Sequence, residues 1–184
     1  MDSTILFKIA RESIKIYLIS GKKADFTEVT KVYPQLLQKQ GSFVTVYVEG
    51  NLRGCIGKIE GDGPLYKDIT DNAVDAAFFD TRFMPIRSEE IPKLHIEISL
   101  LEKPKRLDYS DEDDLFTKLS AKKEGVLLQF MGRRSTFLPQ VWEKIPTAQN
   151  FLKELSYKGG FPKDIWKEKD CQIFTYSASV LKED

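Results

Sequence analysis

The sequence has few of the residues that build disulfides, metal sites and acid–base catalysts. Its 184 residues include two cysteines, Cys55 and Cys171, and one histidine, His95. Two cysteines are too few for a disulfide framework, and they lack the paired spacing of a zinc knuckle. We therefore expect two reduced thiols and no structural or catalytic zinc site.

Long apolar runs and an excess of charge are also missing. No run approaches the roughly 20 apolar residues that span a bilayer, and the N-terminal segment alternates charged with apolar residues, unlike a signal peptide. The 28 basic residues balance 28 acidic residues, so the chain lacks the positive field that attracts nucleic acid or anionic lipid. We expect a cytoplasmic protein with no membrane role, and nucleic acid is disfavoured as a partner.

Periodic patterns in the first half predict two helices, a hairpin and a strand. Apolar residues at helical spacing favour a helix over residues 4–20 and another from residue 65 to about residue 80. A β-branched and aromatic run predicts a hairpin over 41–59 that turns at Gly50-Asn51. Strict alternation of apolar and polar residues predicts a strand over 94–100.

The second half repeats this plan. An acidic helix start follows Ser110, a hairpin is predicted over 125–139, a helix over 148–158 and a strand over 172–180. Trp142, just after that hairpin, is expected to pack as a structural corner because it is large and apolar and follows a proline.

The repeated order indicates an α+β fold. The length lies within the usual size of one domain, so we expect a single domain over residues 1–184. Within it, residues 41–101 and 125–181 would be related by an internal duplication. The two β-α-β units would form a mainly antiparallel sheet with flanking helices.

One segment concentrates reactive and unusual residues. Leu52-Arg53-Gly54-Cys55-Ile56-Gly57 places a cation, a thiol and two glycines within one predicted strand. Two glycines inside a strand indicate a bulge, or a close approach by another backbone or by a ligand. Gly54 and Gly57 are therefore candidate ligand-binding residues.

The expected hairpin register places the cation and the thiol together. A turn at Gly50-Asn51 would pair Val46 with Cys55, and Arg53 and Cys55, two residues apart, would share a sheet face. An arginine near a thiol lowers the thiol pKa and can hold an anionic substrate, as a reactive cysteine requires. The alternative is that Cys55 is a small buried apolar residue beside Val44 and Val46.

His95 offers a weaker candidate. Glu97 and Ser99 lie on the same face of its predicted strand, but residues two apart are about 6.5–7 Å apart and point in parallel, too far for a catalytic triad. If His95 were a base, its partner would come from another strand, with Cys55 the natural candidate. Otherwise His95 lies on the solvated side of a half-buried strand.

Two loops could bind anions. Residues 57–63 lead from a strand to a helix N-terminus, where backbone N–H groups can hold phosphate, but they match neither the Walker nor the dinucleotide pattern. The loop that carries Asp80, Arg82 and Arg87 is either internally neutralised or an anion site. If this loop borders one concave surface with Arg53, then Arg53 and Arg82 would anchor a carboxylate- or phosphate-bearing ligand.

Five blocks of the sequence resemble, in order, the signature blocks of the AMME chromosomal region protein family. They are Leu52-Arg53-Gly54-Cys55-Ile56-Gly57, Asn72-Ala73 with Ala76-Ala77-Phe78, Asp80-Thr81-Arg82-Phe83 with Pro85, Ile96-Glu97-Ile98-Ser99, and Thr136-Phe137-Leu138-Pro139-Gln140-Val141-Trp142. The C-terminal region resembles that of prokaryotic members, the protein A-like components of the AmmeMemoRadiSam system. It departs from them at Lys158-Gly159-Gly160, usually Lys-Ala-Gly, and at Ser135, often Gly.

The resemblance implies a barrel-like, mainly antiparallel sheet and a cleft faced by the Cys55 segment. The family has no settled activity, and whether it uses a cofactor is unknown. Prokaryotic relatives are encoded with, or fused to, a Memo-like protein and a radical SAM protein. We therefore expect an accessory or ligand- and partner-binding component that acts through a cleft at Arg53 and Cys55. The alternative is a cysteine-dependent enzyme with Cys55 as nucleophile and Arg53 as anion anchor.

Overall fold

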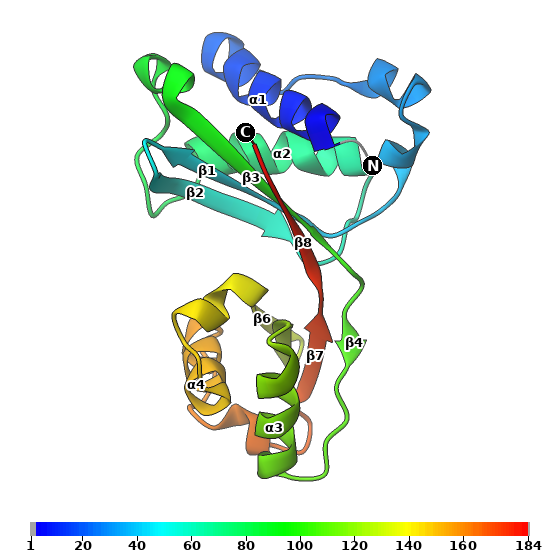
Figure 1. Ribbon diagram of the computed structural model, residues 1–184, viewed down its shortest axis with the longest axis vertical. Coiled ribbons are helices and arrows are strands. Elements are labelled where there is room, and N and C mark those ends of the chain that lie inside the picture. Colours follow the sequence, from blue (N-terminus) through cyan, green and yellow to red (C-terminus); the bar gives the residue numbers. More distant parts are fainter. Residues whose placement is uncertain (1–2, 184) are drawn as a thin grey trace. The chain divides into compact units, whose positions relative to one another are not determined.

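The computed structural model describes residues 3–183 (Figure 1). The chain divides into two compact units, one formed by residues 1–101 with 179–184 and the other by residues 102–178. Each unit contains helices and one four-stranded sheet, with the strand orders β2-β1-β3-β8 and β4-β7-β5-β6. The α+β class and the antiparallel pairing are confirmed. The barrel-like closure is wrong, because within the described residues the two sheets remain separate and open.

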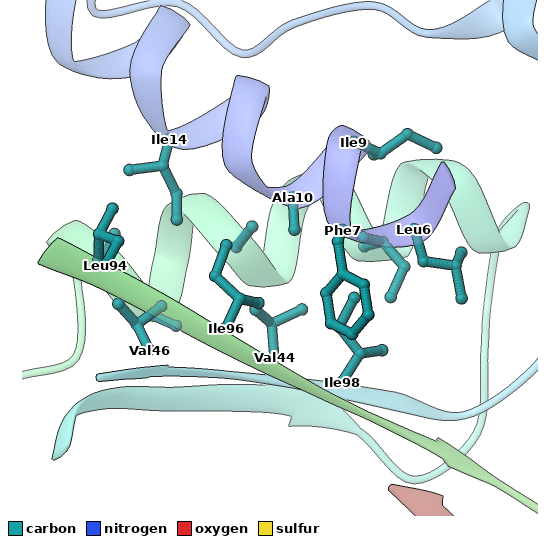
Figure 2. Packing of buried hydrophobic residues seen from close by; sticks show 14 of the residues in the cluster. Leu6, Phe7, Ile9, Ala10, Ile14, Val44, Val46, Leu94, Ile96 and Ile98 are labelled. Carbon is teal, nitrogen blue, oxygen red and sulfur yellow. The ribbon is translucent and has the colours of Figure 1, made fainter. Parts of the chain in front are cut away.

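The first unit contains two helices and the first sheet, joined by short 3-10 turns. Its elements are α1 (Ser3–Ser20), η1 (Thr27–Lys31), η2 (Pro34–Leu37), β1 (Ser42–Val48), β2 (Asn51–Lys58), α2 (Leu65–Phe78), η3 (Ser88–Lys93), β3 (Leu94–Leu101) and β8 (Ala178–Lys182). Both helices pack on one face of the sheet (Figure 2). That face is lined by alternate strand residues such as Val44, Val46 and Ile96, all fully buried. The intervening residues, including Thr45 and Tyr47, point to the opposite face.

The second unit has its own core. Its elements are β4 (Lys105–Arg106), α3 (Glu112–Lys122), β5 (Gly125–Phe130), β6 (Arg133–Phe137), η4 (Pro139–Glu143), α4 (Ala148–Lys158), η5 (Ile165–Lys167) and β7 (Gln172–Tyr176). Trp142 on η4 is 3% exposed and stacks on Phe151 of α4, with 4.0 Å between ring centroids. Its Nε1 donates a 2.8 Å hydrogen bond to the carbonyl of Glu124. The predicted structural corner at Trp142 is confirmed.

The two units share one topology. In each, a helix precedes a hairpin, a second helix and a third strand, and the first strand of the hairpin is flanked by the other two. The fourth strands are exchanged, because β4 follows β3 in the chain but pairs with β7, whereas β8 follows β7 but joins the sheet of β3. The single strand predicted over 172–180 is therefore wrong, because it is two strands that belong to different sheets. The single domain and the duplication stay predictions, and the shared topology favours the duplication.

Candidate functional site

The β1–β2 hairpin turns one residue earlier than predicted. Glu49 and Gly50 both have positive φ, 52° and 79°, which is the pattern of a type I′ turn. The turn is therefore Glu49-Gly50 and not Gly50-Asn51, and Cys55 faces Thr45 instead of Val46. The predicted register is wrong for two reasons. The earlier turn alone would place Cys55 opposite Val44, and one extra residue in β2 then moves its partner to Thr45.

Arg53 is an extra residue in the β2 strand. Val46 opposes Gly54 and Tyr47 opposes Leu52, so the register shifts and Arg53 has no opposite residue on β1. Such a β-bulge re-aims the side chain that it carries. The prediction that Arg53 and Cys55 share a sheet face assumed strict alternation of side chains along β2. The bulge at Arg53 breaks that alternation.

Both glycines of the motif are explained by packing. A Cβ at Gly54 would lie 1.8 Å from the carbonyl oxygen of Ala76, because α2 crosses β2 at this point. A Cβ at Gly57 would lie 2.2 Å from the carbonyl oxygen of Ser42 and 2.4 Å from the ring of Phe43. The glycines therefore allow the close approach of other parts of the chain, and a part for them in ligand binding stays a prediction.

Asp80 and Arg82 clamp the main chain of Cys55. The backbone N–H of Cys55 donates to Asp80 Oδ2 at 3.0 Å, and Arg82 Nη2 donates to the carbonyl of Cys55 at 3.2 Å. Arg82 also holds Asp80 through Nε to Oδ1 at 2.9 Å and Nη2 to Oδ2 at 2.6 Å. Because β2 is an edge strand, these side chains satisfy backbone groups that would otherwise be open to another strand.

The contacts of the clamp lower the pKa of Asp80. The side chain of Asp80 is only 4% exposed, and its pKa is lowered to about 2. The main cause is the hydrogen bonding from Arg82, with further contributions from the backbone N–H groups of Cys55 and Arg82, which together outweigh the effect of burial. Asp80 is therefore an ionised structural anchor at neutral pH.

The thiol of Cys55 belongs to a polar row on the sheet face opposite the helices. Thr45 Oγ1 donates a hydrogen bond to Cys55 Sγ at 3.2 Å, and Cys55 is half-buried. In the same region Tyr47 OH donates to Glu97 Oε2 at 3.4 Å. Burial raises the pKa of Tyr47, and the charges of Glu97 and Cys55 raise it further. The thiol therefore lies outside the apolar core of the first unit and contacts Thr45.

His95 lies away from the thiol. It faces Tyr47 on β1, whereas Cys55 and Glu97 face Thr45 from opposite sides. His95 and Cys55 lie on strands on either side of β1 and are offset by two residues along the strands. Their Cα atoms are therefore about 12 Å apart, and their side chains leave the sheet in the same direction without converging. The pairing of Cys55 with His95 as a base is therefore wrong.

The guanidinium of Arg53 is held by the segment that follows α2. Arg53 Nη1 forms an ion pair with Glu90 Oε1, and Nη2 donates to the carbonyl of Met84 at 3.0 Å. Glu90 also accepts a 2.9 Å hydrogen bond from the backbone N–H of Arg87. Burial alone would raise the pKa of Glu90, but the hydrogen bonds from Arg53 and Arg87 hold it below its ordinary value. Sequence reasoning missed Glu90 because no local pattern links it to Arg53.

An open hollow of about 680 Å³ brings the two predicted anchors together. It is lined by Arg53, Arg82, Phe83, Met84, Pro85 and Arg87. The prediction that Arg53 and Arg82 border one concave surface is confirmed. Cys55 is not part of the lining, although Arg82, which is, donates a hydrogen bond to its carbonyl.

The second hairpin shows which features the fold itself repeats. Thr136 occupies on β6 the place of Cys55 on β2, and its carbonyl accepts a 2.9 Å hydrogen bond from Lys158, as that of Cys55 does from Arg82. In both units, a basic side chain therefore donates to a backbone carbonyl of the edge strand. The β5–β6 pairing has no register shift, so the bulged Arg53 belongs to the first unit alone. This comparison gives Arg82 a structural task, and it shows that the bulged Arg53 has no counterpart in the second unit.

The described part of the chain offers neither a metal centre nor a membrane-spanning helix. Within residues 3–183, no group of three or more His, Cys, Asp and Glu side chains is arranged to hold a metal ion. The helices of that region include none with the length and apolarity needed to cross a bilayer. Cys171 is buried in the second unit, and burial raises its pKa to about 11.

Comparisons with known proteins agree with the motif blocks. The model of the AMMECR1 family matches residues 7–181. Protein MK0488 of Methanopyrus kandleri is 34% identical, with 100% of this chain and 89% of the relative covered. Protein MJ0810 of Methanocaldococcus jannaschii is 30% identical, with 99% of this chain and 90% of the relative covered. None of these names states an activity.

A solved structure supports the same assignment. The crystal structure of the uncharacterized protein PH0010 from Pyrococcus horikoshii superposes with a TM-score of 0.87 at 30% identity, covering 98% of this chain and 90% of that chain. Fold, sequence and motif order thus agree over nearly the whole length. The chain belongs to the AMMECR1 family.

Proposed function

We propose that this chain is a binding component that recognises an anionic group at the hollow lined by Arg53, Arg82 and Arg87. The observation that carries the proposal is the bulged Arg53, which the equivalent hairpin lacks and which is nevertheless fixed by Glu90 and Met84. A residue without a counterpart in the second unit, held by two partners at the wall of a hollow, suits recognition.

The arginines of the hollow retain donors for a ligand. Arg82 uses Nε and Nη2 on Asp80 and Cys55, so its Nη1 has no hydrogen-bond acceptor in the part of the chain that the structure describes. The side chain of Arg87 is 71% exposed and forms ion pairs through Nε, which leaves the outer edge of its guanidinium toward solvent. Guanidinium groups pair with carboxylate and phosphate oxygens through two parallel hydrogen bonds.

The resemblance to prokaryotic members of the family supplies the partner classes for this proposal. A Memo-like protein and a radical SAM protein in the cytoplasm would present the anionic group, or would share a small anionic ligand with this chain. The proposal assigns recognition to Arg53 and the loop over 82–87, with the strand of Cys55 as its support.

The test is a titration of the full chain with sodium acetate and, separately, inorganic phosphate, followed by backbone NMR at constant ionic strength. We expect shifts concentrated at residues 82–87 and a loss of affinity of about tenfold in Arg87→Gln, which leaves the Cys55 clamp intact. Arg106→Gln, which alters an exposed arginine of the second unit, is the matched control. Shifts spread evenly over the chain, or equal in both variants, would overturn the proposal.

A second candidate function is cysteine-dependent catalysis with Cys55 as nucleophile. The hydrogen bond from Thr45 Oγ1 to Cys55 Sγ favours it, because a donor to sulfur stabilises the thiolate. The rate of carbamidomethylation by iodoacetamide as a function of pH tests it, with the buried Cys171 as internal reference. Fast modification of Cys55 with an apparent pKa well below about 8.5 would support catalysis, and a thiol that reacts only after denaturation would exclude it.

A further inference from the structure

The hollow beside Arg53 has an apolar half as well as a cationic one. Phe83, Met84 and Pro85 line it together with the arginines. Met84 is 78% exposed, and the guanidinium of Arg82 lies 5.3 Å from the centre of the Phe83 ring. The hollow thus combines methionine, an aromatic ring and arginines, which are residue types enriched at protein–protein interfaces.

We infer that the occupant of this hollow is a segment of a partner protein that carries an acidic side chain next to an apolar one. The inference rests on the proposed function and names the ligand class for the same site. The acidic side chain would pair with Arg82 and Arg87, and the apolar side chain would cover Met84 and Pro85.

The shape and composition of the hollow favour a protein segment over an enclosed small molecule. Small-molecule sites bury most of the ligand surface, whereas this hollow is open and leaves Met84 exposed. Arginine, methionine and aromatic residues are enriched at protein–protein interfaces, and a flexible thioether adapts to a partner surface.

The local charge favours a carboxylate over a phosphate dianion. The three arginines of the hollow already share the carboxylates of Asp80, Glu89 and Glu90. The site therefore has spare hydrogen-bond donors but little spare positive charge, and a singly charged carboxylate suits that balance better than a phosphate.

The wall of the hollow is held in place by contacts within this chain, without a ligand. Arg53 donates to the carbonyl of Met84, and Glu90 accepts from both Arg53 and the backbone N–H of Arg87. The loop is thus tied to the bulge of β2 directly at Met84 and, through Glu90, at Arg87. A preorganised wall lowers the ordering cost of binding an extended partner segment.

Selection from a displayed library of random peptides, with the immobilised full chain as bait, tests this inference. We expect enriched peptides to carry Asp or Glu within two positions of Leu, Ile, Met or Phe. In Arg87→Gln the preference for acidic residues should fall, and in Met84→Ser the preference for apolar residues should fall. Met131→Ser, which alters a comparably exposed methionine of the second unit, should select the same peptides as the unaltered chain.

The outcomes separate this inference from the function on which it rests. One outcome is that acetate or phosphate binds at residues 82–87 but the selected peptides show no preference for acidic and apolar residues. That outcome would overturn the partner segment and retain the anion site. Enrichment that survives both hollow variants would also overturn it. Failure of the acetate and phosphate titrations would remove the proposed function itself.

Discussion

At the scale of single residues, the main chain of Cys55 is held by side chains of the segment that follows α2. Asp80 and Arg82 hold its N–H and carbonyl, and Gly54 lets α2 approach the strand beside it. The family motif is therefore explained in large part by packing and edge protection. Neither packing nor edge protection accounts for Arg53.

Asp80 should give the protein a specific sensitivity to acid. Its pKa is lowered to about 2, so the stabilisation is present above pH 4 and is lost as the pH falls from about 4 toward 2. We expect the free energy of unfolding to fall over this range by about 2 kcal/mol more than in Asp80→Asn. Urea denaturation at several pH values measures the difference. Asp108→Asn, at a side chain 91% exposed, should behave like the unaltered chain, and parallel pH curves for all three proteins would contradict the clamp.

Gly54 provides a test of packing against ligand binding. Alanine at this position places a Cβ 1.8 Å from the carbonyl oxygen of Ala76, so α2 or β2 must shift. We expect Gly54→Ala to lower the free energy of unfolding by about 3 kcal/mol in urea denaturation. In Gly63→Ala, where a Cβ meets nothing within 4 Å, the effect should stay below about 1 kcal/mol. A stable Gly54→Ala protein with impaired binding would instead assign this glycine to the ligand.

At the scale of elements, the short helix η4 joins the second hairpin to α4 through one buried aromatic stack. Trp142 packs on Phe151, and its indole N–H donates a hydrogen bond to the carbonyl of Glu124. We expect Trp142→Ala to lower the free energy of unfolding by about 3–5 kcal/mol, because a large cavity replaces the ring. Tyr157→Ala, at a residue 83% exposed, is the control. A denaturation midpoint unchanged by Trp142→Ala would show that the corner does not depend on this side chain.

The end of α3 carries a second element-scale prediction. Lys123 follows the helix with φ of 50°, in the left-handed region that glycine adopts without strain. We expect Lys123→Gly to raise the free energy of unfolding by about 0.5–1 kcal/mol. In Lys122→Gly, inside the helix, the same replacement should lower it by a similar amount. Equal effects of the two variants in thermal denaturation would show that the backbone conformation at Lys123 does not decide the outcome.

At the scale of the whole molecule, the exchanged strands make the first unit depend on the C-terminal end of the chain. β8 completes the sheet of β3, and Glu183 there pairs with Arg11 at 2.6 Å and accepts from the backbone N–H of Ile96 at 3.1 Å. In a chain shortened to residues 1–177, we expect amide hydrogen exchange at Ile96 to become faster by about tenfold or more. A chain lacking only residue 184 should keep its protection. Unchanged exchange in the shorter chain would mean that β8 contributes little to the first sheet.

The sequence by itself determined the order of the four α-helices and the two hairpins, the helix at about residues 148–158, and the family, because periodicity, caps and motif blocks are local properties. Only the tertiary structure decided the turn at Glu49-Gly50, the bulge at Arg53 and the split of residues 172–180 between two sheets. The split depends on which distant strand each half joins. The turn and the bulge depend on the register between adjacent strands, where a shift of one residue exchanges the two faces of a strand. The ion pair of Arg53 with Glu90 is decided in the same way, because a bulge and a distant loop must first be brought together.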